Sequence, residues 1–249
     1  MPVLAEFLPT FLGVGVLMAM TLALLLAFRT PHPFAPASAI LRGAIQLAAI
    51  SFVLGGVITN PAWVAIALLV MFTVAAVSAT RRIGWSLPNL GLVSGSMAGG
   101  IAITLAVIFA TGAIALTPRY ALAMGGIVIG NGMTIAVLAG RRFKESAYDR
   151  WEEVEGWLAL GATPRQATLD LARRAVYSAL IPSTDQTKTT GLVTLPGAFV
   201  GAIFGGVSPL EAGRFQIVVL AAIMAAGAIT AVMIVGILAP VRVRPATPR

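Results

Sequence analysis

The amino-acid sequence predicts an all-α polytopic membrane protein with about seven transmembrane helices and one cytoplasmic helix–turn–helix segment. Of its 249 residues, 58% are hydrophobic and 10% are charged, whereas soluble domains carry about 25% charged residues. Several apolar runs reach the roughly 20 residues that a helix needs to cross a bilayer, and they lack the alternating pattern of membrane β-strands. The lysines and arginines gather on one side of these runs. Residues 1–249 are therefore predicted to form one transmembrane domain.

The predicted spans follow the apolar runs in order. They cover residues 8–28, 37–59, 63–79, 90–110, 121–140, 191–207 and 215–239. The N-terminus lacks the basic region of a cleavable signal peptide, so we expect the first run to be retained. Of the 17 lysines and arginines, 15 lie on one side of the spans, and Arg119 and Arg214 lie on the other.

Positively charged loops stay in the cytoplasm. We therefore expect a protein of the inner (cytoplasmic) membrane with its N-terminus outside and its C-terminus in the cytoplasm. The same bias accounts for the net charge of +8, so the charge does not require a nucleic-acid partner.

Residues 141–190 form the one long connection, and they carry seven of the nine acidic residues. Apolar residues recur here at steps of three and four, which predicts an amphipathic helix that extends the fifth span. These residues are Phe143, Ala147, Trp151, Val154 and Leu158. Gly161 is suited to end this helix, because glycine takes the left-handed conformation at little cost.

A second helix is predicted at residues 164–180. Thr163 is its predicted N-cap, Pro164 suits the first helical position, and Gln166 completes a capping box. Pro182 is expected to end the helix. Two interpretations of this helix–turn–helix remain open: a connector whose apolar stripe rests among the lipid headgroups, or a docking element that enters a groove of a partner protein.

The segment EEVEGWLALGATPRQATLDLARRAVYSALIP resembles the EAA loop of ABC-transporter permeases, which docks into a separate ATPase subunit. The matching residues are Glu155, Gly161, Ala162 and Pro182. Gly156 and Trp157 stand where the pattern has two alanines. The resemblance implies these ATPase-coupling residues: Glu152, Glu153, Glu155, Gly161, Ala162, Thr163, Pro164 and Arg165.

The segment ALIPSTDQTKTTGLVTLPGAFVGAIFGGVSPLEAGRFQI is similar to the signature of the FetB family of ABC permeases. LRGAIQL (41–47) and GIVIGNGMTIAV (126–137) resemble two further segments of that family. The family is linked with iron export in bacteria, and its plant relatives are aluminium-tolerance proteins associated with nucleotide-sugar transport. The resemblance implies a permease homodimer that works with an ABC ATPase subunit and exports a metal, iron, from the cytoplasm. A nucleotide sugar or another organic solute is the alternative cargo.

The chain itself lacks the phosphate-binding motif G-x-x-x-x-G-K-[ST]. We therefore expect the partner ATPase to use ATP, and we expect this chain to bind no cofactor and to be no enzyme. A secondary transporter is a further alternative. The absence of acidic residues from the predicted spans weighs against it, because such residues couple transport to protons or sodium.

The sixth predicted span is unusual. Its 17 residues make about 25 Å of helix, less than the roughly 30 Å hydrocarbon core. Short spans interrupted by proline mark transport sites or moving gates, so Pro196 is predicted to be a hinge or pathway residue. Gly197, Gly201 and Gly205 recur at every fourth position, which fits either a pathway or tight helix packing.

A few polar residues complete the predicted pathway. Asp185 and Lys188 are spaced to pair on one helix face, and we expect them to anchor the sixth span at its cytoplasmic mouth, with a ligand role as the alternative. Polar residues within spans face the bundle interior, where they line a path or bond a neighbouring helix. The predicted pathway or gate residues are Gln46, Asn131, Thr134, Asp185, Lys188, Pro196, Gly197 and Gly201.

No metal site is assigned from the sequence. Iron favours carboxylate, imidazole or thiolate ligands, but cysteine is absent and the one histidine, His32, is predicted to lie in an interfacial loop. Glu6 and Glu211, at the outer ends of spans, are the acids placed to meet an exiting cation.

Overall fold

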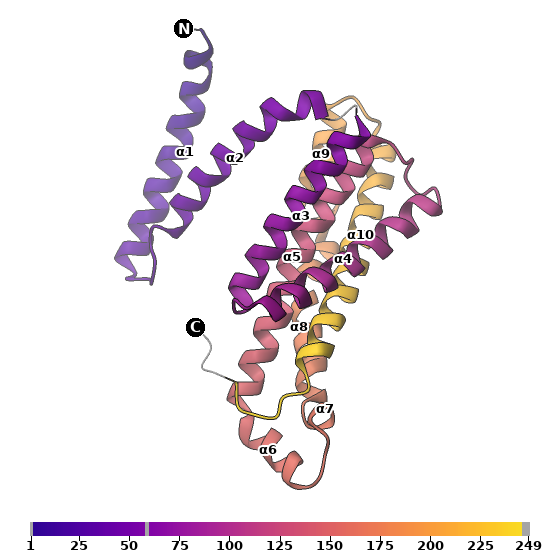
Figure 1. Ribbon diagram of the computed structural model, residues 1–249. Helices are drawn as coiled ribbons and strands as arrows, with labels where there is room; N and C mark the ends of the chain where they lie inside the picture. The colour runs from indigo at the N-terminus through magenta and orange to yellow at the C-terminus, as the bar shows by residue number, and fades with distance from the viewer. Residues whose placement is uncertain (1, 58–59, 246–249) are drawn as a thin grey trace. The chain divides into compact units, whose positions relative to one another are not determined.

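The computed structural model describes residues 2–57 and 60–245. In that part of the chain the regular structure is helical, and the sole β-type pairing is an isolated bridge between Thr190 and Thr194. The predicted all-α fold is therefore confirmed. The chain divides into two compact units, Met1–Val57 and Ile58–Arg249 (Figure 1).

The first unit is a pair of helices, α1 (Pro2–Ala27) and α2 (Ala35–Val57). At the end of α1 the backbone N–H of Thr30 donates to the carbonyl of Leu25 at 3.0 Å, and Arg29 has a φ of 54°. This is the left-handed ending that usually employs glycine. The helices coincide with the first two predicted spans, except that residues 58–59 lie outside the described residues.

The second unit contains the other described helices. They are α3 (Pro61–Ile83), α4 (Leu87–Ala110), α5 (Pro118–Asp149), α6 (Trp151–Ala159), α7 (Pro164–Ala167), α8 (Leu169–Thr189), α9 (Gly197–Phe204) and α10 (Pro209–Leu238). Several begin with a capping side chain and a proline in the first two helical positions. These caps are Asn60, Ser86, Thr117, Thr163 and Ser208. Because the side-chain oxygen satisfies an unpaired backbone N–H and proline suits the first turn, local sequence sets where these helices begin.

Helical stretches that are long and apolar enough to cross a membrane occur five times in the described chain. They are Phe7–Ala27, Pro61–Ile83, Leu87–Ala110, Pro118–Asp149 and Pro209–Leu238. These correspond to the first, third, fourth, fifth and seventh predicted spans. The polytopic membrane class is thus confirmed.

The sixth predicted span, residues 191–207, is wrong as a continuous helix. The structure has a loop at residues 190–196, followed by α9 with only eight residues. Gly191 opens the loop with a φ of +89°, and Pro196 closes it without a backbone N–H to continue a helix. A run that is uniformly apolar in sequence therefore hides a break in the backbone.

The predicted helix end at Pro182 is also wrong, because α8 continues through this residue to Thr189. A proline inside a helix removes one backbone hydrogen bond, but packing on neighbouring helices makes it tolerable. α8 packs against both α5 and α10, with Leu171, Ala175 and Ala179 buried in the core. Tertiary contacts here override the local signal.

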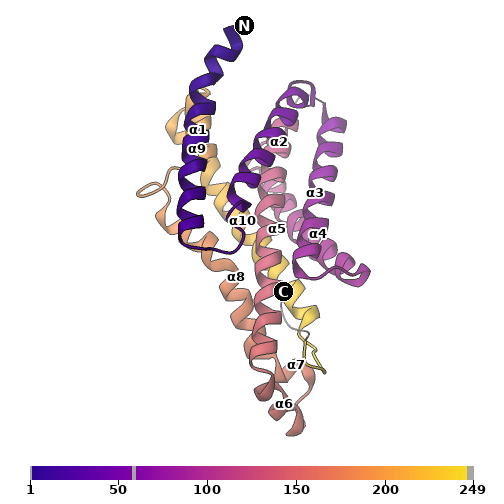
Figure 2. The same ribbon diagram turned by 90° about the vertical axis from the view of Figure 1, so that its left-hand side faces the viewer.

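α5 and α10 lie at the centre of the second unit, where α3 and α4 pack on them and α8 contacts both (Figures 1 and 2). Two glycines allow the close approach. A Cβ at Gly227 would lie 2.3 Å from Ile135, and a Cβ at Gly125 would lie 2.6 Å from Leu68. Small residues at such contacts let helix backbones approach in a membrane. Gly227 also lies against Leu180 of α8, and this contact sets the level at which α8 packs on α10.

Candidate functional site

The helix that extends α5 uses its apolar stripe inside the protein. Phe143, Ala147 and Val154 are buried, at 1%, 0% and 1% exposure, and Trp151 and Leu158 pack partly buried against the same core. The predicted helix is interrupted at Arg150, and the apolar stripe continues beyond the interruption on α6. The stripe is therefore not free to rest among headgroups, and the first interpretation of this segment is wrong in that respect.

The turn between α6 and α7 has the predicted geometry. Gly161 has a φ of +90°, and its N–H donates to the carbonyl of Leu158 while that of Ala162 donates to Trp157, both at 3.0 Å. This is a Schellman ending. Thr163 Oγ1 accepts from the N–H of Gln166, and Gln166 Oε1 accepts from the N–H of Thr163 at 2.9 Å. The predicted capping box is confirmed, and the turn is rigid.

The second predicted helix, residues 164–180, is divided at Thr168 into α7 and α8. The Thr168 side chain is fully buried, and its hydroxyl lies within hydrogen-bond reach of the carbonyls of Pro164 and Ala239. Ala239 follows the end of α10. The base of α8 is thereby tied both to α7 and to the central bundle.

Residues 151–167, here called the coupling tip, expose large apolar side chains. Trp157 is 52% exposed and Leu160 is 82% exposed, at the end of the second unit farthest from α9 (Figure 2). The predicted coupling residues surround them, with Glu152, Glu153, Glu155, Gly161, Thr163 and Arg165 exposed and with Ala162 and Pro164 half-buried. Sequence reasoning missed Trp157 and Leu160 as contact residues, because the period of the stripe drew attention to the face that is buried.

One end of the second unit is rich in arginine, as is expected at a membrane boundary. The arginines at this level are Arg81, Arg82, Arg141 and Arg142. They adjoin the contact between Ile83 of α3 and Gly140 of α5, where an added Cβ would lie 2.9 Å from Ile83. Charged side chains gather at the ends of spans because the hydrocarbon core excludes them.

Asp185 lies well inside this boundary. From Gly140 to Ile135, α5 advances by about 7.5 Å, and Ile135 meets Gly227 of α10, which also lies against Leu180 of α8. From Leu180 to Asp185, α8 advances by about another 7.5 Å. Asp185 therefore lies about 15 Å along the bundle from the arginine-rich end, which is half of the roughly 30 Å thickness of a hydrocarbon core.

Contacts along α8 support this depth. α8 runs antiparallel to α10, with Thr168 beside Ala239 at one end and Thr184 Oγ1 3.9 Å from Met224 Sδ farther along. Met224 lies at the middle of α10, in its apolar part. The expectation that the Asp185 pair lies at the cytoplasmic mouth of a span stays a prediction, and the spacing along α8 argues for a deeper position.

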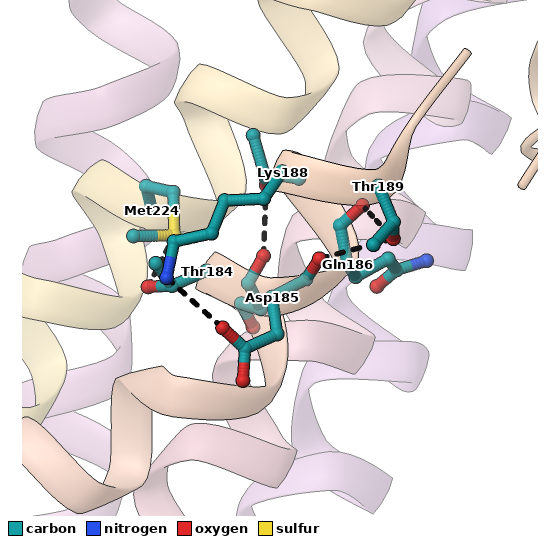
Figure 3. A network of polar contacts seen from close by, with 8 residues as sticks. Thr184, Asp185, Gln186, Lys188, Thr189 and Met224 are labelled. Atoms are coloured by element: carbon teal, nitrogen blue, oxygen red, sulfur yellow. Dashed lines mark hydrogen bonds and ion pairs between the residues drawn. The ribbon is translucent and has the colours of Figure 1, made fainter. Parts of the chain in front are cut away.

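The last turns of α8 form a polar group, here called the membrane cluster: Asp185, Gln186, Lys188 and Thr189 (Figure 3). Lys188 Nζ lies 3.1 Å from Asp185 Oδ1, so the predicted pair is confirmed. The two side chains are 69% and 60% exposed, respectively, in the single chain. The Thr189 hydroxyl donates back to the carbonyl of Asp185 at 3.0 Å.

The loop at residues 190–196 follows the membrane cluster directly. Leu192 is 94% exposed and Val193 is 78% exposed. A Cβ at Gly197 or Gly201 would meet nothing within 4 Å, so no other helix of the described chain packs closely on the open side of these predicted packing glycines. The sixth predicted span is thus discontinuous, which is typical of helices that form transport sites.

Two of the other predicted pathway residues bond within their own helix. Asn131 is half-buried and donates to the carbonyl of Ile127 at 2.9 Å, and Thr134 is exposed and donates to that of Gly130 at 3.3 Å. Gln46 is exposed on α2, in the first unit. Its role stays a prediction.

Several buried polar residues were missed, and Gln216 has the largest side chain among them. Gln216 of α10 is 5% exposed, and its Oε1 has no hydrogen-bond partner within the described residues. A glutamine inside the apolar run of the seventh span was the available signal.

Metal-ligating side chains are scattered. Across residues 2–57 and 60–245, no group of three or more His, Cys, Asp or Glu side chains lies together. His32 sits in the turn between α1 and α2, and Glu211 lies in the first turn of α10. The side chain of Glu6 is outside the described residues.

Comparison with known proteins identifies the family. The model of an uncharacterised protein family, UPF0014, matches residues 10–241. The chain belongs to the UPF0014 family. No solved structure matches it.

Three named proteins are among the relatives that the chain resembles. The rice UPF0014 membrane protein STAR2 is 39% identical over 78% of this chain and 69% of its own length. The Arabidopsis thaliana protein ALUMINUM SENSITIVE 3 is 38% identical over 77% of this chain and 71% of its own. An Escherichia coli protein named "Probable iron export permease protein FetB" is 38% identical over 48% of this chain and 46% of its own. The predicted family is confirmed.

Proposed function

We propose that this chain is the membrane-spanning permease subunit of an ATP-binding cassette transporter. The observation that carries the proposal is the coupling tip: a rigid turn that exposes Trp157 and Leu160 at the arginine-rich end of the bundle. The positive-inside rule places that end in the cytoplasm, where an ATPase works. Large apolar side chains exposed together mark a protein-binding surface, and a helix end of this kind fits a partner's groove.

The fold supplies a route from the coupling tip to the membrane. α7 joins α8 through the buried Thr168, which also contacts the end of α10. α8 then reaches the membrane cluster without a break in the helix. Movement of the tip by ATP-driven closure of two ATPase subunits is thereby passed to Asp185 and Lys188. One chain holds about half of the spans of a complete transporter, so the proposed assembly is a homodimer of permeases with two ATPases.

Export of iron is the cargo that the printed name of the E. coli relative supports. The side chains favour a second candidate, a nucleotide sugar or another polar organic solute. No metal-ligating group of three is found in the described chain, and Lys188 already neutralises Asp185. A secondary transporter needs no ATPase, and the shaped coupling tip weighs against it.

The docking step is tested by co-purification with the ATPase. Leu160→Glu places a charge on the exposed tip without changing a glycine or a buried residue. We expect the amount of ATPase recovered with the permease to fall at least about tenfold, as for loss of an interface hot spot. Leu210→Glu is the matched control, because Leu210 is 87% exposed in the first turn of α10, a helix that enters the membrane from the opposite end. Equal recovery of the ATPase with both variants would contradict the docking assignment.

A further inference from the structure

The membrane cluster combines two properties that lipid does not tolerate. It lies about 15 Å from the arginine-rich boundary, at the middle of the core, and its acid and base are both more than half exposed in the single chain. A charged side chain at the bilayer centre faces the bundle interior or a water-filled cavity. Lys188 is held by Asp185 at 3.1 Å, so it does not extend toward either membrane surface.

The polar face continues along α8 to the arginine-rich end. Asp170 and Arg174 lie on this face, 15 and 11 residues before Asp185. Tyr177, which is 71% exposed, and Ile181, which is 38% exposed, lie between them and Asp185. The opposite face of α8 is buried against α5 and α10. A continuous exposed strip therefore leads from the coupling end to the loop at residues 190–196.

We infer that this strip of α8 is one wall of a water-filled translocation path, and that a second copy of this chain closes the path from the lipid. The inference rests on the proposed function and assigns the path to one helix face. The neutral Asp185–Lys188 pair is self-complementary across a two-fold axis, because each copy presents an acid and a base. The flanking Tyr177, Ile181 and Leu192 supply an apolar rim that a second copy covers.

The chemistry of the membrane cluster selects a class of solute. The carboxylate of Asp185 and the ammonium of Lys188 offer hydrogen-bond acceptors and donors of both charges on the exposed strip. The ammonium of Lys188 beside Asp185 repels a bare divalent cation. The path therefore suits a polar organic solute that exchanges hydrogen bonds with water and protein in turn.

The absence of cysteine from the chain allows a direct test in membranes. Ile181→Cys, on the exposed strip of α8, is compared with Ile103→Cys, in membranes that contain the permease without an ATPase, by reaction with a charged, membrane-impermeant methanethiosulfonate. Ile103 is 53% exposed on α4, and α4 does not contact α8 in the described chain. It lies three residues beyond Gly100, which packs on Thr230 of α10, and so comes to a depth comparable to that of Ile181.

We expect the thiol at position 181 to react at least tenfold faster than the thiol at position 103, and a short bifunctional thiol reagent to link two copies through position 181 alone. Equal, slow reaction of both thiols in membranes, with full reaction of both after denaturation, would overturn the assignment. Fast reaction without linked copies would overturn the second copy as the closing partner. Because no ATPase is present, these results are independent of the docking test on Leu160.

Discussion

Two ion pairs on the same helix have nearly the same geometry and very different surroundings. Arg174 Nε lies 2.8 Å from Asp170 Oδ2, with the side chains 70% and 59% exposed. Lys188 Nζ lies 3.1 Å from Asp185 Oδ1, with the side chains 69% and 60% exposed. The first pair lies level with the arginine-rich end, where exposed pairs contribute little, and the second lies at the middle of the membrane.

The exposed fraction of an ion pair therefore has to be interpreted together with the depth of the pair in the membrane. An exposed pair at the aqueous end needs no partner, whereas an equally exposed pair in the core requires water or protein around it. The coupling tip shows the reverse case, since Leu160 is an apolar residue exposed where the surroundings are aqueous. Both mismatches predict a missing neighbour: an ATPase at the tip and a second copy at the membrane cluster.

The largest effect is expected from breaking the inner pair. Lys188→Met leaves the Asp185 carboxylate without its partner, and we expect the transport rate to fall at least about tenfold, because an uncompensated charge at the depth of the membrane core is costly even where it meets water. The double variant Asp185→Asn, Lys188→Gln keeps the polarity without the charges and should lose less. A double variant as impaired as Lys188→Met would mean that the charges themselves, and not their balance, are required.

An intermediate effect is expected from displacing α8. At Gly227 an added Cβ would lie 2.3 Å from Ile135 and 3.5 Å from Leu180, so Gly227→Val forces α5, α8 and α10 apart. Overpacking of this kind costs about 1–3 kcal/mol, and we expect a lower thermal unfolding temperature in detergent. Gly130→Val is the control, because a Cβ there meets nothing within 4 Å. Similar unfolding temperatures for the two variants would contradict the close contact.

The smallest effect is expected from breaking the outer pair. Arg174→Met removes the partner of Asp170, which Arg150 also approaches at 3.8 Å. Exposed pairs are worth about 0–1 kcal/mol, so transport should change less than twofold. A loss as large as that for Lys188→Met would remove the distinction between the two depths.

Local signals in the sequence predicted local structure well. The capping box of Thr163 and Gln166 and the left-handed Gly161 were predictable, because each depends on residues within one turn. The pairing of Asp185 with Lys188 was predictable for the same reason, since it requires only an i, i+3 spacing on a helix.

Features that depend on distant contacts were not predictable. Pro182 ends no helix, because α5 and α10 support α8 on both sides of it. The depth of Asp185 depends on the contact of Leu180 with Gly227, which no sequence window contains. The apolar run at residues 191–207 conceals a loop, because hydropathy does not register the φ of Gly191.

The central claim, a permease driven by a separate ATPase, is tested most directly in inside-out vesicles that contain both subunits. ATP-driven uptake of ferrous iron is measured beside uptake of a nucleotide sugar, with a catalytically inactive ATPase as the control. We predict that one of the two solutes accumulates with the active ATPase and not with the inactive one. The side chains of the membrane cluster favour the nucleotide sugar as that solute. Uptake that is equal with the active and the inactive ATPase would contradict the proposal that a separate ATPase drives this permease.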